Sequence, residues 1–134
     1  MAHFAELNSA NMVLRVTVVE NKDTADVNGV EKEYIGQAHL EKVLGGTWKQ
    51  TSYNGNMRGN YAGKGFTYFV DQDLFMPPKP YNSWSMATAE ATWQAPITVP
   101  SLTKEEINAG KFYSWDEDVY QADNTKGWVL KTLG

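Results

Sequence analysis

Hydrophobic and polar residues alternate along the first part of the chain, a pattern typical of β-strands with one buried face. Residues 2–7 predict a short strand and residues 12–20 the strongest strand of the chain. These two segments, joined by a polar turn at residues 8–11, are expected to form an opening hairpin. In the second strand, alternation divides the side chains into one face with Leu14, Val16 and Val18 and another with Val13, Arg15, Thr17 and Val19.

The period of the hydrophobic pattern changes in residues 31–44. Tyr34, Ala38 and their neighbours three and four positions away lie on one helical stripe. The Gly-Gly pair at 45–46 is suited to the left-handed conformation that commonly ends a helix. Although Gly36 is unfavourable inside a helix, the segment as a whole predicts one helix over residues 31–44.

Short strands and turns are expected in the rest of the chain, with one exception. Thr103 lies three residues before Glu106, the spacing of a capping box, so a short helix is predicted near 103–109. Residues 54–65 form a Gly/Asn-rich loop, and the Pro-rich residues 77–80 form an extended connector. The expected strands are 47–53, 66–70, 74–76, 82–86, 92–98, 111–115, 119–121 and 127–132.

These patterns predict an α+β fold of mostly short antiparallel β-strands and hairpins. The helix at about 31–44 is expected to pack on the sheet, with the short helix near 103–109 late in the chain. A length of 134 residues fits a single domain, residues 1–134. The segment 101–134 is a candidate for a separate, appended hairpin.

Two segments of the chain resemble each other. Residues 68–75 and 113–120 share an aromatic start, an Asp-x-Asp centre and an aromatic end. Both are expected to be hairpins around acidic turns. Similar turn chemistry explains this likeness without a common origin, and a duplicated docking hairpin is the alternative.

Composition and charge exclude several classes of protein. The net charge is −4 and the basic residues are scattered, so no positive stripe for nucleic acid is expected. No apolar run reaches the length of a membrane helix, and the first residues lack the features of a signal peptide. Five Trp, seven Tyr and five Phe favour pleated, half-buried surfaces.

Catalytic motifs are missing from the sequence. There is no Cys, and no motif surrounds either His3 or His39. The Gly-rich stretch 59–65 is one residue short of a phosphate-binding loop, and Gly65 stands where that loop needs a hydroxyl. The acidic pairs in the two predicted turns favour solvated carboxylates over a calcium site. We therefore expect no enzyme activity, no cofactor and no metal.

Binding residues are expected on two segments. The Gly/Asn-rich loop combines amides, a guanidinium and phenols, which suit polar recognition, although its Asn side chains are equally suited to bonding their own backbone. Trp and Tyr near the Pro-rich connector form a second candidate surface, unless Trp84 belongs to the core. The candidate contact residues are Tyr53, Asn54, Asn56, Arg58, Asn60, Tyr61, Tyr81 and Trp84.

Several blocks of the sequence resemble one family. The most specific is Trp48-Lys-Gln-Thr-Ser-Tyr-Asn-Gly-Asn-Met-Arg58, which is continued by residues 60–63 and 65–68. Further blocks are residues 1–7, 13–16, 78–84 and 93–96. Together they resemble small, mostly uncharacterised proteins encoded by tailed phages of marine cyanobacteria and related marine bacteria. The resemblance spans nearly the whole chain and implies a phage origin, no known enzyme activity and a place in the particle.

From this resemblance we expect a non-enzymatic accessory or structural protein of the virion, such as a capsid decoration, neck or tail component. It would be made in the host cytoplasm and act through contacts with other virion proteins, and a homo-oligomer fits the same expectation. Two alternatives stay open. One is a glycan- or receptor-binding module on the particle, and the other is a host-takeover protein that binds a bacterial enzyme inside the cell.

Overall fold

The computed structural model describes residues 1–133 and confirms an α+β fold of small antiparallel sheets. The chain divides into two compact units. Unit 1 comprises Met1–Lys79 and Ala87–Thr92, and unit 2 comprises Pro80–Met86 and the chain from Trp93 onward. The elements are β1 (Ala2–Leu7), β2 (Val13–Val19), the 3₁₀ turn η1 (Asn21–Asp23), α1 (Glu33–Leu44), β3 (Thr47–Thr51), β4 (Thr67–Phe69), β5 (Leu74–Met76), β6 (Ser85–Ala87), β7 (Thr92–Gln94), α2 (Lys104–Asn108), β8 (Lys111–Trp115), α3 (Glu117–Ala122) and β9 (Trp128–Thr132).

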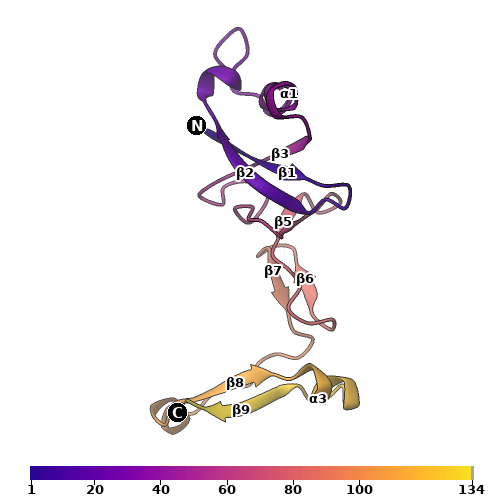
Figure 1. The fold of residues 1–134 in the computed structure, drawn as a ribbon. Helices are drawn as coiled ribbons and strands as arrows, with labels where there is room; N and C mark the ends of the chain where they lie inside the picture. Colours follow the sequence, from indigo (N-terminus) through magenta and orange to yellow (C-terminus); the bar gives the residue numbers. More distant parts are fainter. Residues whose placement is uncertain (134) are drawn as a thin grey trace. The chain divides into compact units, whose positions relative to one another are not determined.

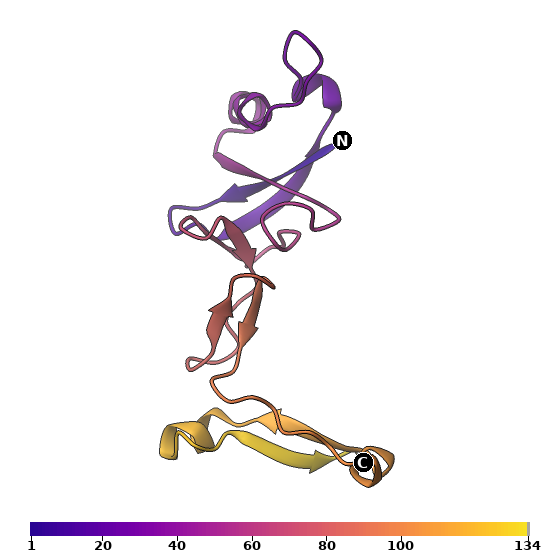
Figure 2. The ribbon, with the colours of Figure 1, turned by 180° about the vertical axis from the view of Figure 1, so that it is seen from behind.

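Unit 1 is built on a three-stranded antiparallel sheet with the order β2-β1-β3. The predicted opening hairpin is confirmed by the β1–β2 pairing. Both views of the ribbon place α1 on one side of this sheet and the segment around β5 on the other (Figures 1 and 2). The sheet is therefore covered on both faces, which explains why β1 has buried residues on both faces.

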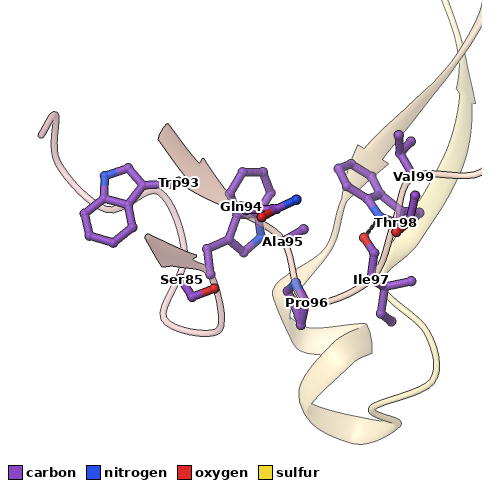
Figure 3. Close-up of a pocket in the computed structure, with 10 residues that line it drawn as sticks. Ser85, Trp93, Gln94, Ala95, Pro96, Ile97, Thr98 and Val99 are labelled. Atoms are coloured by element: carbon purple, nitrogen blue, oxygen red, sulfur yellow. Dashed lines mark hydrogen bonds between the residues drawn. The ribbon is translucent and has the colours of Figure 1, made fainter. Parts of the chain in front are cut away.

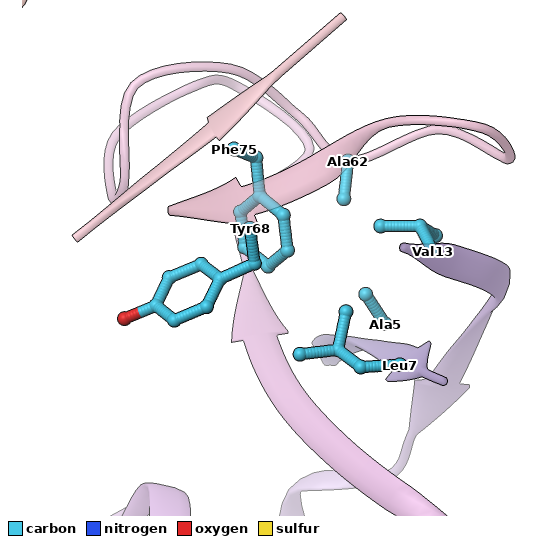
Figure 4. Packing of buried hydrophobic residues seen from close by; sticks show 6 residues of the cluster. All are labelled: Ala5, Leu7, Val13, Ala62, Tyr68 and Phe75. Carbon is cyan, nitrogen blue, oxygen red and sulfur yellow. The ribbon is translucent and has the colours of Figure 1, made fainter. Parts of the chain in front are cut away.

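Each face of the sheet has its own hydrophobic cluster. On the α1 side, the buried residues are Ala2, Phe4, Val19, Leu40 and Trp48. On the other side, side chains of β1 and β2 pack against Tyr68 and Phe75 of the β4–β5 hairpin and Ala62 of the Gly/Asn-rich loop (Figure 4). The Tyr68 hydroxyl points away from the other residues of this cluster (Figure 4).

Gly36 makes the close packing of α1 on the sheet possible. A Cβ atom at this position would lie 2.4 Å from Cζ of Phe4, a side chain with 0% exposure. The residue that disfavours a helix by its propensity is thus the one that lets the helix approach the sheet. The predicted helix over 31–44 is confirmed as Glu33–Leu44, and it ends at Gly45, with φ 71°.

A β-bulge changes which residues of β2 share a face. The register with β1 shifts between Glu6 and Leu7, so that Leu7 pairs with Val13 and Glu6 with Arg15. Val13 consequently joins the Tyr68 cluster, whereas Val19 joins the Phe4 cluster. Simple alternation wrongly grouped these two valines, because the extra residue of a bulge reverses the alternation beyond it.

Unit 2 contains the two-stranded antiparallel sheet of β8 and β9, whose register pairs Lys111 with Thr132 and Trp115 with Trp128. The predicted capping box before α2 is confirmed, because Thr103 and Glu106 each bond the other's backbone N–H. The last predicted strand is confirmed as β9. The ribbon shows β8 and β9 side by side, with α3 at one end of the pair (Figure 1).

The second predicted hairpin is wrong. Residues 117–122 form α3 rather than a strand, and β8 pairs with β9 instead. The Asp116 side chain caps this helix by accepting the N–H groups of Asp118 and Val119. In the first segment, by contrast, Asp73 adopts φ 54° and closes a true β4–β5 hairpin. The two similar segments therefore have different structures, and a duplicated hairpin is excluded.

Candidate functional site

Arg58 is engaged inside unit 1. Its guanidinium forms a two-pronged ion pair with Glu33 of α1, with Nη1–Oε2 and Nη2–Oε1 distances of 2.8 and 3.0 Å. Its Nε donates to Asp73 Oδ1 at 2.8 Å, and Nη1 also donates to the Gln50 carbonyl at 2.9 Å. The Arg58 side chain is 13% exposed. We call this group of Arg58, Glu33 and Asp73 the Arg58 clamp.

The charges of the Arg58 clamp stabilise one another. Burial alone would raise the pKa of Glu33, but hydrogen bonds from Arg58 and from Gln50 N–H, with the positive charge of Arg58, lower it overall. Hydrogen bonds from the Tyr68 hydroxyl and from Arg58 lower the pKa of Asp73. Both carboxylates are therefore ionised at neutral pH, where they form ion pairs with Arg58.

The Arg58 clamp also protects the outer edge of β3. The N–H of Gln50 donates to Glu33 Oε2 at 2.7 Å, while its carbonyl accepts from Arg58. Further along the same strand, Gln37 Nε2 donates to the Trp48 carbonyl at 2.8 Å. Side chains thus occupy backbone groups that an edge strand would otherwise offer to another chain.

Asn60 also bonds within unit 1. Its amide nitrogen donates to the carbonyls of Phe75 and Ala91, at 2.8 and 2.9 Å. Arg58 and Gly59 both adopt the left-handed conformation, with φ 54° and 74°, which directs successive residues of the loop inward. Of the predicted contact loop, these two polar candidates, Arg58 and Asn60, hold the loop in place.

Tyr53 and Tyr61 form a cluster with His3. The ring centroids are 5.3 Å apart for the two tyrosines, and 5.9 and 5.6 Å from His3 to Tyr53 and Tyr61. Tyr53 is 68% exposed, and Asn54 and Asn56 are also exposed. Tyr53 and Asn54 border a hollow of about 350 Å³ beside β1 and β3. The structure therefore brings these candidates together on an accessible surface of unit 1.

The remaining predicted candidates, Tyr81 and Trp84, belong to an aromatic cluster in unit 2. Their ring centroids lie 5.4 Å apart, and Trp84 also packs against Trp115 and Trp128 at 6.0 and 6.2 Å. Trp115, 6% exposed, is the centre of this cluster. Trp84 is half-buried, so it contributes both to the core of unit 2 and to its surface.

Glu117 is a central residue that the sequence did not reveal. Its carboxylate accepts from Ser83 Oγ at 2.5 Å, Ser83 N–H at 3.1 Å, Trp115 Nε1 at 2.9 Å and Gln121 Nε2 at 3.0 Å. These donors, led by Ser83 and Trp115, lower its pKa to about 2. One signal in the sequence could have indicated the helix that carries Glu117: Asp116 is suited to cap a helix, and acidic residues follow it in the first turn. The same residues also fit an acidic hairpin turn, which is the structure predicted from the sequence.

A groove of about 570 Å³ runs along the aromatic cluster of unit 2. It is lined by Trp84, Trp93 and Trp128 and by residues of the extended segment 94–99. Trp93 lies at one end of the labelled residues and Val99 at the other (Figure 3). The indole Nε1 of Trp128 donates to the Ile97 carbonyl at 2.7 Å, which fixes this wall to β9.

Within residues 1–133, neither unit contains a group of metal ligands or a helix that could span a membrane. No three His, Asp or Glu side chains of this range gather as metal ligands would, and none of its helices is long and apolar enough to cross a bilayer. Asp73 is bound by Arg58 and Tyr68, and Asp116 caps α3. These acidic residues thus have structural partners.

Comparison with known proteins identifies no relative of this chain. No protein-family model, no curated protein and no solved structure matches the chain. The resemblance to phage proteins therefore stays a prediction.

Proposed function

We propose that this chain is a non-enzymatic accessory protein of a tailed-phage particle, acting in the capsid decoration, neck or tail through protein–protein contacts. It is made in the host cytoplasm and resides in the virion. The sequence resemblance supplies the phage context of this proposal. The surface of unit 2 supplies its physical support.

The supporting observation is the incomplete burial of unit 2. Among the described residues of this unit, Trp115 is the one buried hydrophobic side chain. A two-stranded ribbon is only marginally stable unless other elements cover it. Several large apolar side chains of the unit are exposed: Val99, Ile107, Phe112, Leu130 and Leu133, at 50, 60, 36, 39 and 72%.

A phage particle offers surfaces that can cover the exposed apolar side chains of unit 2. Its symmetric lattice presents the same fixed surface many times, so that weak contacts of each copy are multiplied. Apolar side chains of the β8–β9 ribbon would be covered on docking, which contributes roughly 25 cal/mol for each Å² of apolar surface removed from water. Other virion proteins are therefore the partners we propose, with further copies of this chain in the same assembly.

The polar residues of the chain support a structural role in preference to catalysis. Arg58 binds both Glu33 and Asp73, and Glu117 is surrounded by donors from its own unit. Groups held in this way order the backbone around them. They favour a rigid protein that presents surfaces to partners.

Quantitative mass spectrometry of gradient-purified particles of the encoding phage tests the proposal. We expect the chain at a fixed ratio to the major capsid protein, and that ratio distinguishes shell from neck or tail. Abundant chain in infected cells that is missing from the particles would refute the proposal. That result would favour a host target inside the cell.

A further inference from the structure

The groove of unit 2 combines aromatic rings with neutral hydrogen-bonding groups. Its walls include the indoles of Trp84, Trp93 and Trp128, the Gln94 amide and the hydroxyls of Ser85 and Thr98. None of the residues that line it is charged. Its volume of about 570 Å³ lies within the range of small-molecule pockets, roughly 300–1,000 Å³.

We propose that this groove binds a neutral carbohydrate. A sugar ring has one chemistry on its faces and another at its rim: C–H groups pack on the electron-rich face of an indole, while the hydroxyls seek donors and acceptors. The mixture of indoles, amide and hydroxyls in the groove matches both. Phosphorylated or acidic ligands would leave their charge without a partner here, which costs free energy.

One of the indoles that line the groove has a buried N–H group. Trp84 Nε1 is buried without a hydrogen-bond partner among the described residues, whereas Trp128 Nε1 is bound to the Ile97 carbonyl. An unpaired buried donor costs about 1–3 kcal/mol. A sugar hydroxyl would remove that cost if binding turned the ring edge of Trp84 toward the groove.

The aromatic wall is held in place before any ligand arrives. Trp115 packs against Trp128 with ring centroids 5.2 Å apart and against Trp84 at 6.0 Å. Glu117 in turn accepts the Trp115 indole N–H. A wall fixed by packing and hydrogen bonds loses little conformational entropy on binding, which favours affinity for a weakly held ligand.

The test uses the full recombinant chain and a panel of short neutral oligosaccharides built from glucose, mannose, galactose and N-acetylglucosamine. Binding is followed by the NMR signals of the indole N–H groups and by isothermal titration calorimetry. At least one sugar of the panel should shift the signals of Trp84, Trp93 and Trp128. Trp48 lies in unit 1 and serves as the control within the same molecule.

Variants assign the site. Trp93→Ala should weaken binding about tenfold or more, as expected for an aromatic contact at a binding site. Gln94→Ala and Thr98→Val alter exposed side chains, so they report on the groove even if Trp93→Ala does not fold; each should weaken binding several-fold. Tyr34→Ala removes an exposed aromatic ring from unit 1 and should leave the affinity unchanged.

The inference is overturned if no sugar of the panel shifts the groove indoles, or if Gln94→Ala and Thr98→Val bind as well as the wild-type chain. Loss of binding in Tyr34→Ala would place the sugar on unit 1 instead. A proline-rich peptide that shifts the same indoles when no sugar does would also contradict it. These results concern the purified chain, so they are independent of whether the protein is found in particles.

Discussion

The guanidinium of Arg58 joins three segments of unit 1, because its partners come from α1, from β3 and from the β4–β5 turn. These contacts require the planar guanidinium of arginine, which can bond Glu33 with two nitrogens and Asp73 with the third. Arg58 holds these contacts in a left-handed backbone conformation, φ 54°, that costs a non-Gly residue free energy. The contacts of the Arg58 clamp therefore offset the free-energy cost of this backbone conformation.

Arg58→Lys should lower the free energy of unfolding of unit 1 by about 2 kcal/mol, because lysine keeps the charge but loses the fork. Arg15→Lys is the matched control. Arg15 pairs with Glu6, but its side chain is 51% exposed, so we expect a loss below about 1 kcal/mol. Urea unfolding followed by the Trp48 indole signal measures both. Equal losses in the two variants would contradict the role given to the clamp.

We expect Glu117 to make the stability of unit 2 depend on pH. Its pKa in the folded chain is about 2, below the ordinary value of 4.5. A lowered pKa contributes stability that is complete above the ordinary value and is lost as the pH falls toward the folded value. The wild-type unit should therefore lose stability between about pH 4.5 and 2.

Glu117→Gln tests this pH dependence. The variant should be less stable than the wild-type chain at neutral pH, and its stability should fall less over the acidic range. The urea midpoint, followed by the indole signals of Trp115 and Trp128, gives the comparison. Two parallel curves would show that other acidic groups dominate the acid response.

At the scale of one element, α1 shows that packing can outweigh propensity. In an exposed helix, replacing Gly by Ala gains about 1 kcal/mol. At position 36, however, the new methyl group would collide with the buried ring of Phe4. Overpacking of a core costs about 1–3 kcal/mol, so we expect this cost to exceed the gain in helix propensity.

Gly36→Ala should accordingly destabilise unit 1 by about 1 kcal/mol. Ala38→Gly, at an exposed position of the same helix, should also cost about 1 kcal/mol, through propensity alone. Thermal or urea unfolding of the two variants, with the Trp48 signal as reporter, provides the measurement. If Gly36→Ala were more stable than the wild-type chain, the packing of Phe4 against α1 would be wrong.

Local features of the elements could be predicted from the sequence because their causes lie within a few residues. The β1–β2 hairpin with its short turn, the Gly-Gly end of α1 and the capping box of Thr103 and Glu106 are of this kind. The bulge in β2 and the pairing of β8 with β9 depend on partners elsewhere in the chain. An Asp-x-Asp motif serves a hairpin or a helix cap equally well, so residues 116–118 were misassigned.

The candidate site was predicted in part for the same reason. Residue type and loop position identified Tyr53 and Asn54 as accessible groups, and the structure places them beside a common hollow. The same reasoning could not show that Arg58 and Asn60 turn inward, because their partners, Glu33 and Ala91, are distant in sequence. Glu117 was missed since Ser83 and Trp115 meet it only in the folded unit.

At the scale of the whole molecule, the two units differ in how well they cover their apolar residues. Unit 1 buries a sheet between α1 and the β4–β5 hairpin, whereas unit 2 relies on one aromatic cluster around Trp115. A small unit with so little buried surface gains most from an external partner. We therefore propose that the chain docks on the particle through unit 2, by its β8–β9 ribbon.

Amide hydrogen exchange of β8 and β9, measured for the purified chain and for the chain within gradient-purified particles, tests the proposed docking. We expect these amides to exchange markedly more slowly in the particle, because a partner covers the ribbon. The amides of β1, buried inside unit 1, should be protected equally in both samples. Equal exchange of β8 and β9 in the two samples, or particles without the chain, would contradict it.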